Sequence, residues 1–458
     1  MEFLKIPKQI LLKKTISLSL SFFLHAMKFS SSHLGEKSHH NRLSQREKWG
    51  WFTPLLWSFL GMTAIVSFFF FSFSSLSPPN PFLVLRPKLL GLQSVVHDPI
   101  ASPPKEKQRC NLFKGNWVKD VKGAVTYTNW SCPTIPESKN CFKQGRKDAG
   151  FVNWRWKPDE CELPRFDPMA FLHLLRGKKL AFIGDSVARN HMESLLCILS
   201  QVETPEDVYK DSEDRFRRWY FPKSEVTLMV LWTKFLVAGE ERFVNGTGTG
   251  VFDLQFDKLD DGWTRHLPDI DYAIISNGHW FFRVLYLHEE DAKIANCIYC
   301  SDPNVTNYDP DFALKMAFRA ALKYINNCKS CGKLVTFVRT FSPAHFENGV
   351  WNTGGYCNRT RPSSAKDMNL ESFDWKMREV QIEEVEKAKQ EAGEAGRRFE
   401  VIDVTTAMMM RADGHPGEFW GNKWMKGYND CVHWCLPGPI DAWNDLLMAL
   451  ITKEAAMD

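Results

Sequence analysis

The chain has 458 residues, 44% of them hydrophobic and 24% charged, and this composition excludes a wholly disordered or collagen-like protein. A formal net charge of only +4 argues against a nucleic-acid binder that works by neutralising phosphates. The positive charge is concentrated in the first 48 residues, which carry nine Lys or Arg and three Asp or Glu. The basic character therefore belongs to the N-terminal tail, and the remainder of the chain is slightly acidic.

An uncharged stretch runs from Trp49 to Leu85 and includes an almost entirely apolar or small segment at 51–73. A helix needs about 20 such residues to cross the hydrocarbon core of a bilayer. Because the basic tail 1–50 precedes this segment, we expect a single-pass type II membrane protein with a cytoplasmic tail. A cleaved signal peptide would have a shorter apolar segment nearer the start. A buried core helix is the other alternative, but no second apolar segment lies nearby to cover it.

The segment 74–109 is predicted to be an extended stalk. Seven prolines lie between Ser77 and Arg109, and proline-rich sequence without a hydrophobic pattern forms spacers rather than cores. The stalk would hold a lumenal domain, residues 110–458, away from the bilayer.

All twelve cysteines follow the stalk, which fits an oxidising lumen and a framework of disulfides. Four N-glycosylation acceptors lie in the same region and indicate the same compartment. They are Asn129, Asn245, Asn304 and Asn358.

Two Cys-x-x-Cys pairs, at Cys297/Cys300 and Cys328/Cys331, raise the alternative of a zinc site. The gap between the two pairs is longer than the usual spacing of a zinc ribbon. In this compartment we expect disulfides and no metal, and the pairing of the twelve cysteines stays open.

A candidate nucleophile follows a short apolar run. The run 180–183 reads as a buried strand, Gly184-Asp185-Ser186 as a tight turn, and 187–199 as a helix with apolar spacing. This order places the Ser186 hydroxyl at the carboxyl end of a strand and directs backbone N–H groups at the opening of a helix. A catalytic serine with an oxyanion hole needs both features. A plain turn is the alternative.

A candidate base lies near the C-terminus. Asp430 and His433 are three residues apart, so the carboxylate can reach the imidazole, fix its tautomer and stabilise its protonated form. Cys431 and Cys435 flank the histidine, and we expect both to be held in disulfides. The alternative is that Asp430 and His433 are surface turn residues.

Strand and helix patterns alternate between these two ends, which predicts a mostly parallel sheet covered on both faces. The expected strands are 225–232, 272–276, 334–339 and 400–404, and the expected helices are 311–326 and 368–392.

Ligands of such sheets bind at the carboxyl ends of the strands. Asn277, which follows the strand 272–276, is therefore a candidate oxyanion donor, and Gly239 is a candidate backbone donor. Either could be a simple turn residue. Arg189 and Asn190, about one turn after Ser186, are expected to support the Ser186 loop, and Arg189 is also a candidate substrate contact.

Four blocks of the chain resemble a known family. Residues 110–117 (CNLFKGNW) are similar to its C-D-x-F-x-G-x-W opening, although Asn111 replaces the usual aspartate. Residues 154–158 (WRWKP), 184–190 (GDSVARN) and 430–438 (DCVHWCLPG) resemble its later blocks. The chain is thereby identified as resembling the plant trichome birefringence-like polysaccharide O-acetyltransferases, and it looks most similar to the xyloglucan-acetylating branch.

This resemblance implies an SGNH/GDSL-hydrolase-like α/β fold with an N-terminal, disulfide-tied lobe. It also implies a catalytic triad of Ser186, His433 and Asp430, a location in the plant Golgi membrane and no metal cofactor. The expected reaction forms an acetyl-serine from an acetyl donor, for which acetyl-CoA is a candidate, and passes the acetyl group to a sugar hydroxyl. The expected partners are the polysaccharide, the acetyl donor, the membrane and a membrane protein that supplies acetyl groups.

Three alternatives to xyloglucan acetylation stay open. The acceptor could be mannan or xylan. The same triad could also remove acetyl groups, as in a polysaccharide acetylesterase. A non-catalytic wall-polymer binding protein is the third possibility, because the tryptophans of the body can stack on sugar rings without any chemistry.

Overall fold

The computed structural model describes residues 110–120, 126–288, 294–392, 397–421 and 427–457. The predicted tail, membrane-spanning segment and stalk all lie outside these residues. In the described part of the chain, no helix is both long and apolar enough to cross a membrane.

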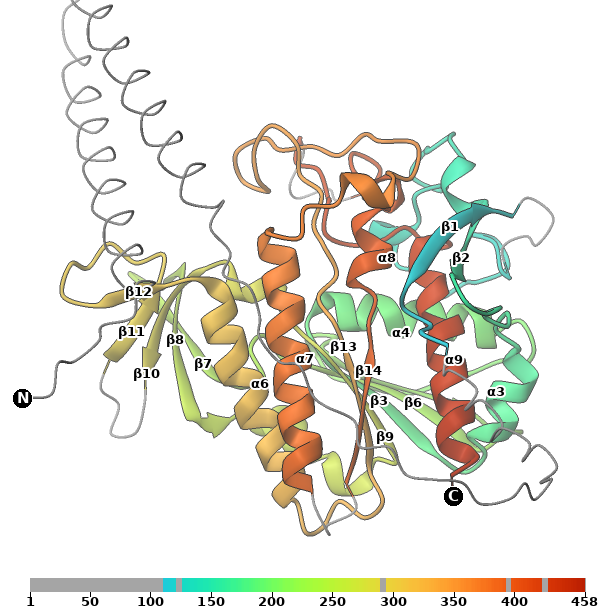
Figure 1. Ribbon diagram of the computed structural model, residues 1–458, viewed down its shortest axis with the longest axis horizontal. Helices are drawn as coiled ribbons and strands as arrows, with labels where there is room; N and C mark the ends of the chain where they lie inside the picture. The colour runs from blue at the N-terminus through green and yellow to red at the C-terminus, as the bar shows by residue number, and fades with distance from the viewer. Residues whose placement is uncertain (1–109, 121–125, 289–293, 393–396, 422–426, 458) are drawn as a thin grey trace, which may run out of the picture. The chain divides into compact units, whose positions relative to one another are not determined.

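A seven-stranded sheet in the order β14-β13-β9-β3-β6-β5-β4 forms the centre of the body (Figure 1). The first five strands are parallel, and β5 and β4 extend the sheet antiparallel to β6. The prediction of a mostly parallel sheet is confirmed, with an antiparallel pair at one edge. The strands are β3 (Lys179–Gly184), β4 (Glu206–Lys210), β5 (Phe216–Phe221), β6 (Val226–Trp232), β9 (Tyr272–Ser276), β13 (Val335–Arg339) and β14 (Arg398–Ile402).

Helices cover both faces of this sheet, because its central strands are apolar on both sides. On β3, Leu180 and Phe182 join one core cluster, while Ala181 and Ile183 join the other. The first face packs against α3 (Pro168–Leu174), α4 (Ser186–Leu199), α8 (Thr405–Met409) and α9 (Ala442–Ala455). The second face packs against α5 (Asp261–Thr264), α6 (Pro310–Asn327) and α7 (Phe373–Ala392).

Two predicted elements have different boundaries in the structure. The helix expected from residue 368 begins at Phe373, because the Ser372 hydroxyl accepts a hydrogen bond from the N–H of Trp375 and so caps the helix. The strand expected at 400–404 is shifted toward the N-terminus as β14, since the N–H of Val404 donates to Thr340 Oγ1 rather than to a neighbouring strand.

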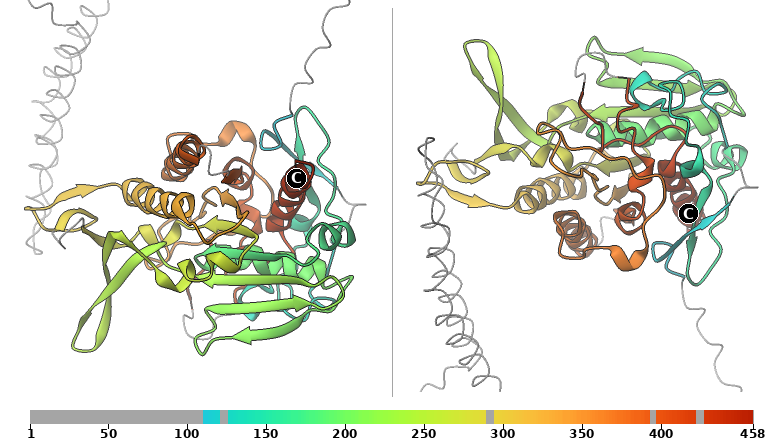
Figure 2. Two further views of the ribbon diagram at one scale, coloured as in Figure 1. Left: turned by 90° about the horizontal axis from the view of Figure 1, so that it is seen from below. Right: turned by 90° about the horizontal axis from the view of Figure 1, so that it is seen from above.

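A second sheet, of five strands in the order β12-β11-β10-β8-β7, was not predicted. It lies beside α6, at the end of the body away from α9 (Figures 1 and 2). Its strands have no continuous apolar run, because they are exposed on one side and carry charges and glycines. They are β7 (Val237–Val244), β8 (Thr247–Leu259), β10 (Val284–His288), β11 (Ile294–Ile298) and β12 (Thr306–Tyr308).

The N-terminal lobe is built on a short antiparallel pair, β1 (Gly115–Lys119) and β2 (Trp154–Pro158). A disulfide between Cys110 and Cys161 closes it, which confirms the expectation of a disulfide-tied lobe. The lobe is held to the body by a buried ion pair of 2.6 Å between Lys139 Nζ and Glu193 of α4.

All twelve cysteines form disulfides. The pairs are Cys110–Cys161, Cys132–Cys197, Cys141–Cys435, Cys297–Cys300, Cys328–Cys331 and Cys357–Cys431. Each Cys-x-x-Cys motif closes on itself, so its sulfurs are not available as zinc ligands.

The four predicted glycosylation acceptors lie at the surface. Asn245, Asn304 and Asn358 are exposed, and Asn129 is half-buried. Asn245 occupies the hairpin between β7 and β8, where its φ of +50° lies in the left-handed region that asparagine tolerates. Glycosylation itself stays a prediction.

The long-range disulfides should contribute more stability than the local ones. Cys141–Cys435 joins residues 294 positions apart, whereas Cys328–Cys331 joins residues three positions apart. The loss of chain entropy in the unfolded state grows with the length of the closed loop. The double replacement Cys141→Ser/Cys435→Ser should therefore lower the free energy of unfolding in urea by about 2–5 kcal/mol. Cys328→Ser/Cys331→Ser serves as the matched control and should lower it less, and an equal loss would contradict this explanation.

Candidate active site

The Ser186 turn connects β3 to α4 in the predicted order of strand, turn and helix. Gly184 has a φ of +151°, and a Cβ at this position would lie 1.7 Å from the carbonyl oxygen of Ser276, so only glycine fits. Asp185 caps α4 by accepting a 2.9 Å hydrogen bond from the N–H of Val187. Ser186 is the first residue of α4, at the carboxyl end of the central strand.

The Asp185 carboxylate also fixes the neighbouring loop. It is fully buried and accepts hydrogen bonds from the N–H groups of Gly278 (3.0 Å) and His279 (3.2 Å), which follow β9. One carboxylate therefore holds together the carboxyl ends of β3 and β9. This gives Asp185 a positioning role beside Ser186.

Asp430 and His433 form the hydrogen-bonded pair that their spacing predicted. His433 Nδ1 lies 2.8 Å from Asp430 Oδ2, and Asp430 Oδ1 accepts the N–H groups of Val432 (3.1 Å) and His433 (3.0 Å). Burial alone would raise the pKa of Asp430, but the charge and hydrogen bonds of His433 outweigh burial and hold it well below its usual value.

Because a carboxylate can only accept, Nδ1 of His433 carries the proton and Nε2 is left with its lone pair. Nε2 is buried and has no hydrogen-bond partner among the described residues. An unpartnered imidazole nitrogen of this kind is what a general base for a serine hydroxyl requires.

The structure brings the Ser186 helix and the His433 loop together through Asn190. This residue lies one turn after Ser186 on α4, and its side chain binds the backbone of Trp434, the residue after His433. The N–H of Trp434 donates to Asn190 Oδ1 at 2.8 Å, and Asn190 Nδ2 donates to the Trp434 carbonyl at 3.3 Å. The two segments, which are far apart in sequence, thus meet at the opening of α4.

Two disulfides hold the His433 loop, one before and one after His433 in the sequence. Cys431 is bonded to Cys357, and Cys435 is bonded to Cys141 of the N-terminal lobe. The expectation that both flanking cysteines are in disulfides is confirmed. The imidazole is therefore held between two covalent links that are four residues apart.

Asn277 and Gly239, the two predicted oxyanion donors, lie in different surroundings. Asn277 is buried after β9, and its Nδ2 donates to the Thr233 carbonyl at 3.0 Å, which engages one of its two amide hydrogens. Gly239 lies on β7 of the second sheet, packed on the side chains of Phe235 and Leu254.

Arg189 forms ion pairs with two carboxylates. Its Nε lies 3.0 Å from Glu193, and its Nη2 lies 2.9 Å from Asp214 Oδ2. These two carboxylates occupy the guanidinium, so in this structure Arg189 braces α4. This agrees with the expectation of loop support.

His279 is a residue of the site to which sequence reasoning gave no role. It follows the predicted oxyanion residue, and its Nε2 is buried without a partner in the described part of the chain. Burial lowers the pKa of His279 to about 4, while the nearby Asp185 charge raises it and Arg339 and His433 lower it. A neutral imidazole therefore stands close to both halves of the site. The only sequence signal was its position two residues after Asn277.

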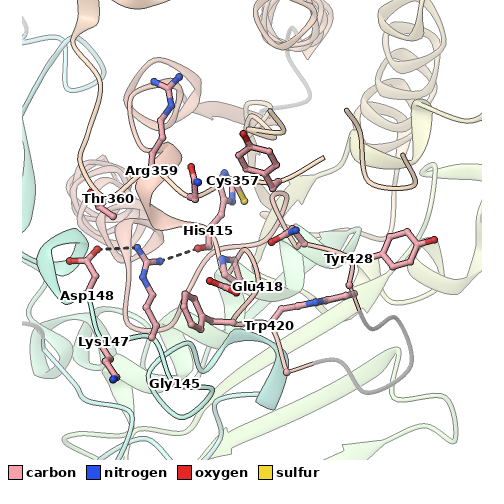
Figure 3. A pocket seen from close by; sticks show the side chains of 18 residues that line it. Gly145, Lys147, Asp148, Cys357, Arg359, Thr360, His415, Glu418, Trp420 and Tyr428 are labelled. Atoms are coloured by element: carbon pink, nitrogen blue, oxygen red, sulfur yellow. Dashed lines mark hydrogen bonds and ion pairs between the residues drawn. The ribbon is translucent and has the colours of Figure 1, made fainter. Parts of the chain in front are cut away.

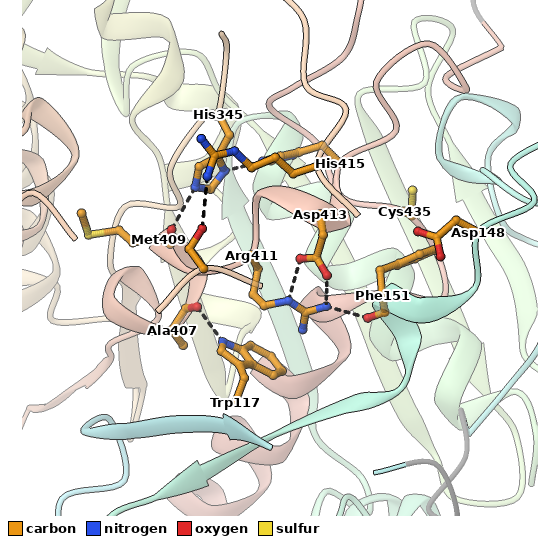
Figure 4. Close-up of polar contacts among 12 residues, drawn as sticks. Trp117, Asp148, Phe151, His345, Ala407, Met409, Arg411, Asp413, His415 and Cys435 are labelled. Atoms are coloured by element: carbon orange, nitrogen blue, oxygen red, sulfur yellow. Dashed lines mark hydrogen bonds and ion pairs between the residues drawn. The ribbon is translucent and has the colours of Figure 1, made fainter. Parts of the chain in front are cut away.

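Two further histidines, His415 and His345, support the His433 loop through hydrogen bonds. His415 Nδ1 donates to the His433 carbonyl at 2.7 Å, and His345 Nδ1 lies 2.7 Å from His415 Nε2 (Figure 4). Burial lowers the pKa of His345 to about 4 and that of His415 well below its usual value. Burial thus favours the neutral form of both rings, which then have two N–H groups for three contacts, the third being that of His345 Nε2 with the Met409 carbonyl at 3.3 Å.

A cavity of about 990 Å³ adjoins the same loop (Figure 3). His415 and Asn429, the residue before Asp430, form part of its wall, whereas Ser186 and His433 do not. Its remaining wall is rich in aromatic and polar side chains. These include Arg146, Lys147, Tyr356, Asn358, Arg359, Glu418, Phe419, Trp420 and Tyr428.

No group of three or more histidine, cysteine or acidic side chains is arranged to hold a metal ion in the described ranges. The chemistry available to the site is that of a serine hydroxyl, an imidazole and a buried carboxylate. This set suits acyl transfer.

We predict that Asn190→Ala slows the reaction of Ser186 with a serine-directed organophosphorus probe by about ten- to a hundredfold. The replacement removes both hydrogen bonds that place Trp434, so the imidazole beside it loses its alignment. The measurement is the rate of covalent labelling by mass spectrometry. Asn326→Ala is the matched control, because Asn326 Nδ2 likewise donates to a backbone carbonyl, that of Ala388, away from the site. Equal slowing by both variants would contradict the positioning role.

The buried His345 ring should give stability that depends on pH. Because its pKa is lowered in the folded chain, the unfolded chain binds the proton first as the pH falls below about 6.5. The contribution of the ring to the free energy of unfolding should fall by on the order of 2 kcal/mol between about pH 7.5 and 5.

In urea unfolding, the destabilisation by His345→Gln should therefore be largest near neutral pH and shrink by that amount in acid. His173→Gln is the control, since His173 is exposed. A destabilisation by His345→Gln that stays constant over this range would contradict the prediction.

Comparisons with known proteins agree with this geometry. Residues 163–450 match the model of a GDSL/SGNH-like acyl-esterase family found in Pmr5 and Cas1p, and residues 108–162 match the PMR5 N-terminal domain. These two matches divide the chain at the boundary between the lobe and the body.

Several plant proteins are similar over most of their length. Xyloglucan O-acetyltransferase 3 of Populus trichocarpa is 58% identical over 380 residues, covering 82% of this chain and 95% of its own. Xyloglucan O-acetyltransferase 2 of Arabidopsis thaliana is 53% identical over 436 residues, covering 93% and 100%. Protein trichome birefringence-like 20 of Arabidopsis thaliana is 43% identical over 352 residues, covering 76% and 73%. This chain therefore belongs to the GDSL/SGNH-like acyl-esterase family and, within it, to the trichome birefringence-like proteins.

Proposed function

We propose that this chain transfers acetyl groups to hydroxyl groups of a plant cell-wall polysaccharide, with xyloglucan as the preferred acceptor. The observation that carries the proposal is the Asp430–His433 pair, held by Asn190 at the opening of the helix that begins with Ser186. The relatives named as xyloglucan O-acetyltransferases support transfer to xyloglucan over the mannan and xylan alternatives.

The proposed reaction has two displacements. His433 Nε2 takes the proton of Ser186 while the hydroxyl oxygen attacks the acetyl carbonyl, and the donor leaves with that proton. A sugar hydroxyl then attacks the acetyl-serine, His433 takes its proton, and the proton returns to Ser186. The ionised Asp430 stabilises the imidazolium in both steps.

The oxyanion would be held at the opening of α4. The first N–H groups of a helix have no partner within the helix and favour negative charge. Asn277 has a second amide hydrogen for the same oxyanion, and Gly239 remains a predicted donor. No metal takes part in this proposal.

The cavity beside the His433 loop is the proposed acceptor site. Its aromatic side chains, Tyr356, Trp420 and Tyr428, can pack on the faces of sugar rings, and its polar side chains can bind hydroxyl groups. The exposed Asn358 lies in the same wall, so a glycan on this residue would narrow the cavity. Water must be limited at the acetyl-serine for transfer to exceed hydrolysis.

The proposed location is the Golgi membrane, with a type II topology and a lumenal body. The uncharged segment 51–73, the disulfides and the four glycosylation acceptors support it. The acetyl donor, acetyl-CoA or a related compound, would be a co-substrate, and a membrane protein that supplies acetyl groups is the expected partner.

The lumenal body should acetylate unmodified xyloglucan oligosaccharides and should form a covalent acetyl-serine. Ser186→Ala should abolish both products, and His433→Gln should lower the rate by about 10³-fold or more, because nucleophile and base act as one unit. Mass spectrometry detects the acetyl group on the sugar and on the peptide that contains Ser186. The control is Ser212→Ala, at an exposed serine.

Three outcomes would contradict the proposal. Turnover by Ser186→Ala would remove Ser186 from the mechanism. Release of acetate from pre-acetylated sugar, without transfer, would indicate an acetylesterase. Binding of the polymer without any reaction would indicate a wall-polymer binding protein.

A further inference from the structure

A group of cationic and tryptophan side chains lies at the carboxyl ends of β6 and β9, outside the triad. We call it the cation–tryptophan cluster. Its members are Arg215, Trp232, Lys234, Trp280, Arg283 and Trp351.

The cluster lies beside the Ser186 turn. Trp232, the last residue of β6, is in register with Gly184, and the next N–H, that of Thr233, donates to the Gly184 carbonyl at 2.8 Å. Trp280 directly follows His279, whose N–H binds Asp185. Both indoles are therefore attached to backbone that contacts the two residues before Ser186, and their rings meet edge to face at 6.0 Å.

Arg283 is the most exceptional member. Its guanidinium carbon lies 5.4 Å from the ring centre of Trp280 and 4.6 Å from that of Trp351. It forms no ion pair or hydrogen bond with any described residue. Burial lowers its pKa more than the charge of Glu241 raises it. Its N–H donors are left for a group from outside.

The second cation, Lys234, contacts the same Trp280 ring as Arg283. Lys234 lies 5.0 Å from the ring centre of Trp280. Burial lowers the pKa of Lys234, Glu241 raises it, and the charges of Arg215 and Arg283 lower it further. Like charges thus repel within the cluster.

The carboxylates near the cluster do not neutralise it. Glu241 is 4.0 Å from Lys234, and Glu213, which is mostly exposed, is 2.8 Å from Arg215. The cluster therefore contains three cations and has two carboxylates near it. Neither carboxylate is in contact with Arg283. Repelling charges that are half removed from water are unfavourable unless a ligand of opposite charge compensates them.

Xyloglucan is an uncharged polymer, so a site for its sugar rings needs aromatic faces but no cations. The other reactant of the proposed function is the acetyl donor. Arginine and lysine bind phosphate groups, and indole faces stack on a planar base. We propose that the cation–tryptophan cluster binds the phosphate-bearing leaving group of the acetyl donor, a thioester of a phosphorylated carrier. This inference rests on the proposed function.

With this donor, the bond that forms at the acetyl carbon is matched by one that breaks, and the proton has an acceptor. Ser186 Oγ forms the new bond to the acetyl carbon, the carbon–sulfur bond breaks, and the thiolate leaves with the proton held by His433. The cluster contacts only the carrier, its phosphate groups through the cations and its planar base through the indoles, so its members are binding residues rather than catalytic residues. The sugar enters from the side of the cavity after the carrier has left.

The test compares two donors, acetyl-CoA and the uncharged ester 4-nitrophenyl acetate, with a xyloglucan oligosaccharide as acceptor. In Arg283→Gln and Lys234→Gln, the ratio of kcat/KM for acetyl-CoA to that for the uncharged ester should fall about tenfold, which corresponds to about 1.4 kcal/mol. The loss should appear in KM for acetyl-CoA, and Arg283→Lys should restore part of it. Lys323→Gln, at an exposed lysine of α6, is the control and should leave the ratio unchanged.

A second measurement separates this inference from the proposed function. Calorimetric titration with coenzyme A, which has no acetyl group to transfer, should show binding to Ser186→Ala protein. Arg283→Gln in the same background should weaken binding about tenfold, and the thermal unfolding midpoint of each variant checks that it is folded.

An unchanged donor ratio together with unchanged coenzyme A binding would overturn the inference. So would an effect confined to the KM of an acidic oligosaccharide, which would assign the cluster to the acceptor. Loss of transfer from both donors in the unmodified protein would instead contradict the proposed function, while the titration would still test the cluster.

Discussion

The site depends on one constraint, the fixation of the loop from Asp430 to Cys435 against the first turn of α4. Apart from an isolated bridge between Asp430 and Gly417, the loop has no regular secondary structure, so few backbone hydrogen bonds hold it. Two disulfides and the pair of hydrogen bonds between Asn190 and Trp434 take over this role. A general base must be placed to within a fraction of an ångström, and covalent links at both sides of His433 reduce the freedom of the loop accordingly.

The N-terminal lobe is part of this arrangement. Cys141 belongs to the lobe, and Arg146 of the lobe donates to the carbonyls of His415 and Asp413, behind the catalytic loop. The lobe therefore supports the site without contributing a reacting group. Its separate family match, to the PMR5 N-terminal domain, covers residues 108–162 and so includes Cys141 and Arg146.

Charge is distributed unevenly around the nucleophile. Asp185 and Asp430 are buried carboxylates satisfied by backbone N–H groups or by an imidazole, whereas Arg339 is a buried guanidinium that donates to Ser276 Oγ at 2.8 Å. Burial lowers the pKa of Arg339 to about 10, and the nearby Asp185 raises it. The histidines around the loop stay neutral.

Much of the sheet and the Asp430–His433 pair could be read from the sequence, because their signals are local. The run before Gly184 is apolar on both faces, and the Asp430–His433 spacing lies within one turn. The second sheet could not be read, since β7 and β8 are exposed and charged on one side. The boundary of α7 depended on a single capping contact from Ser372. Asn190 was expected to support the Ser186 loop, but its partner Trp434 is 244 positions away in the sequence. His279 carried no pattern that separates a supporting side chain from any other polar residue.

Sequence alone therefore determined the order of most strands and helices of the main sheet, and it predicts the reacting groups and the compartment. Those conclusions rest on residue type and spacing, which act over a few positions. The pairing of the cysteines, the partner of Asn190 and the cation–tryptophan cluster required the folded chain. They join residues tens to hundreds of positions apart, and only the packing of strands and loops decides which of many possible partners come within contact distance.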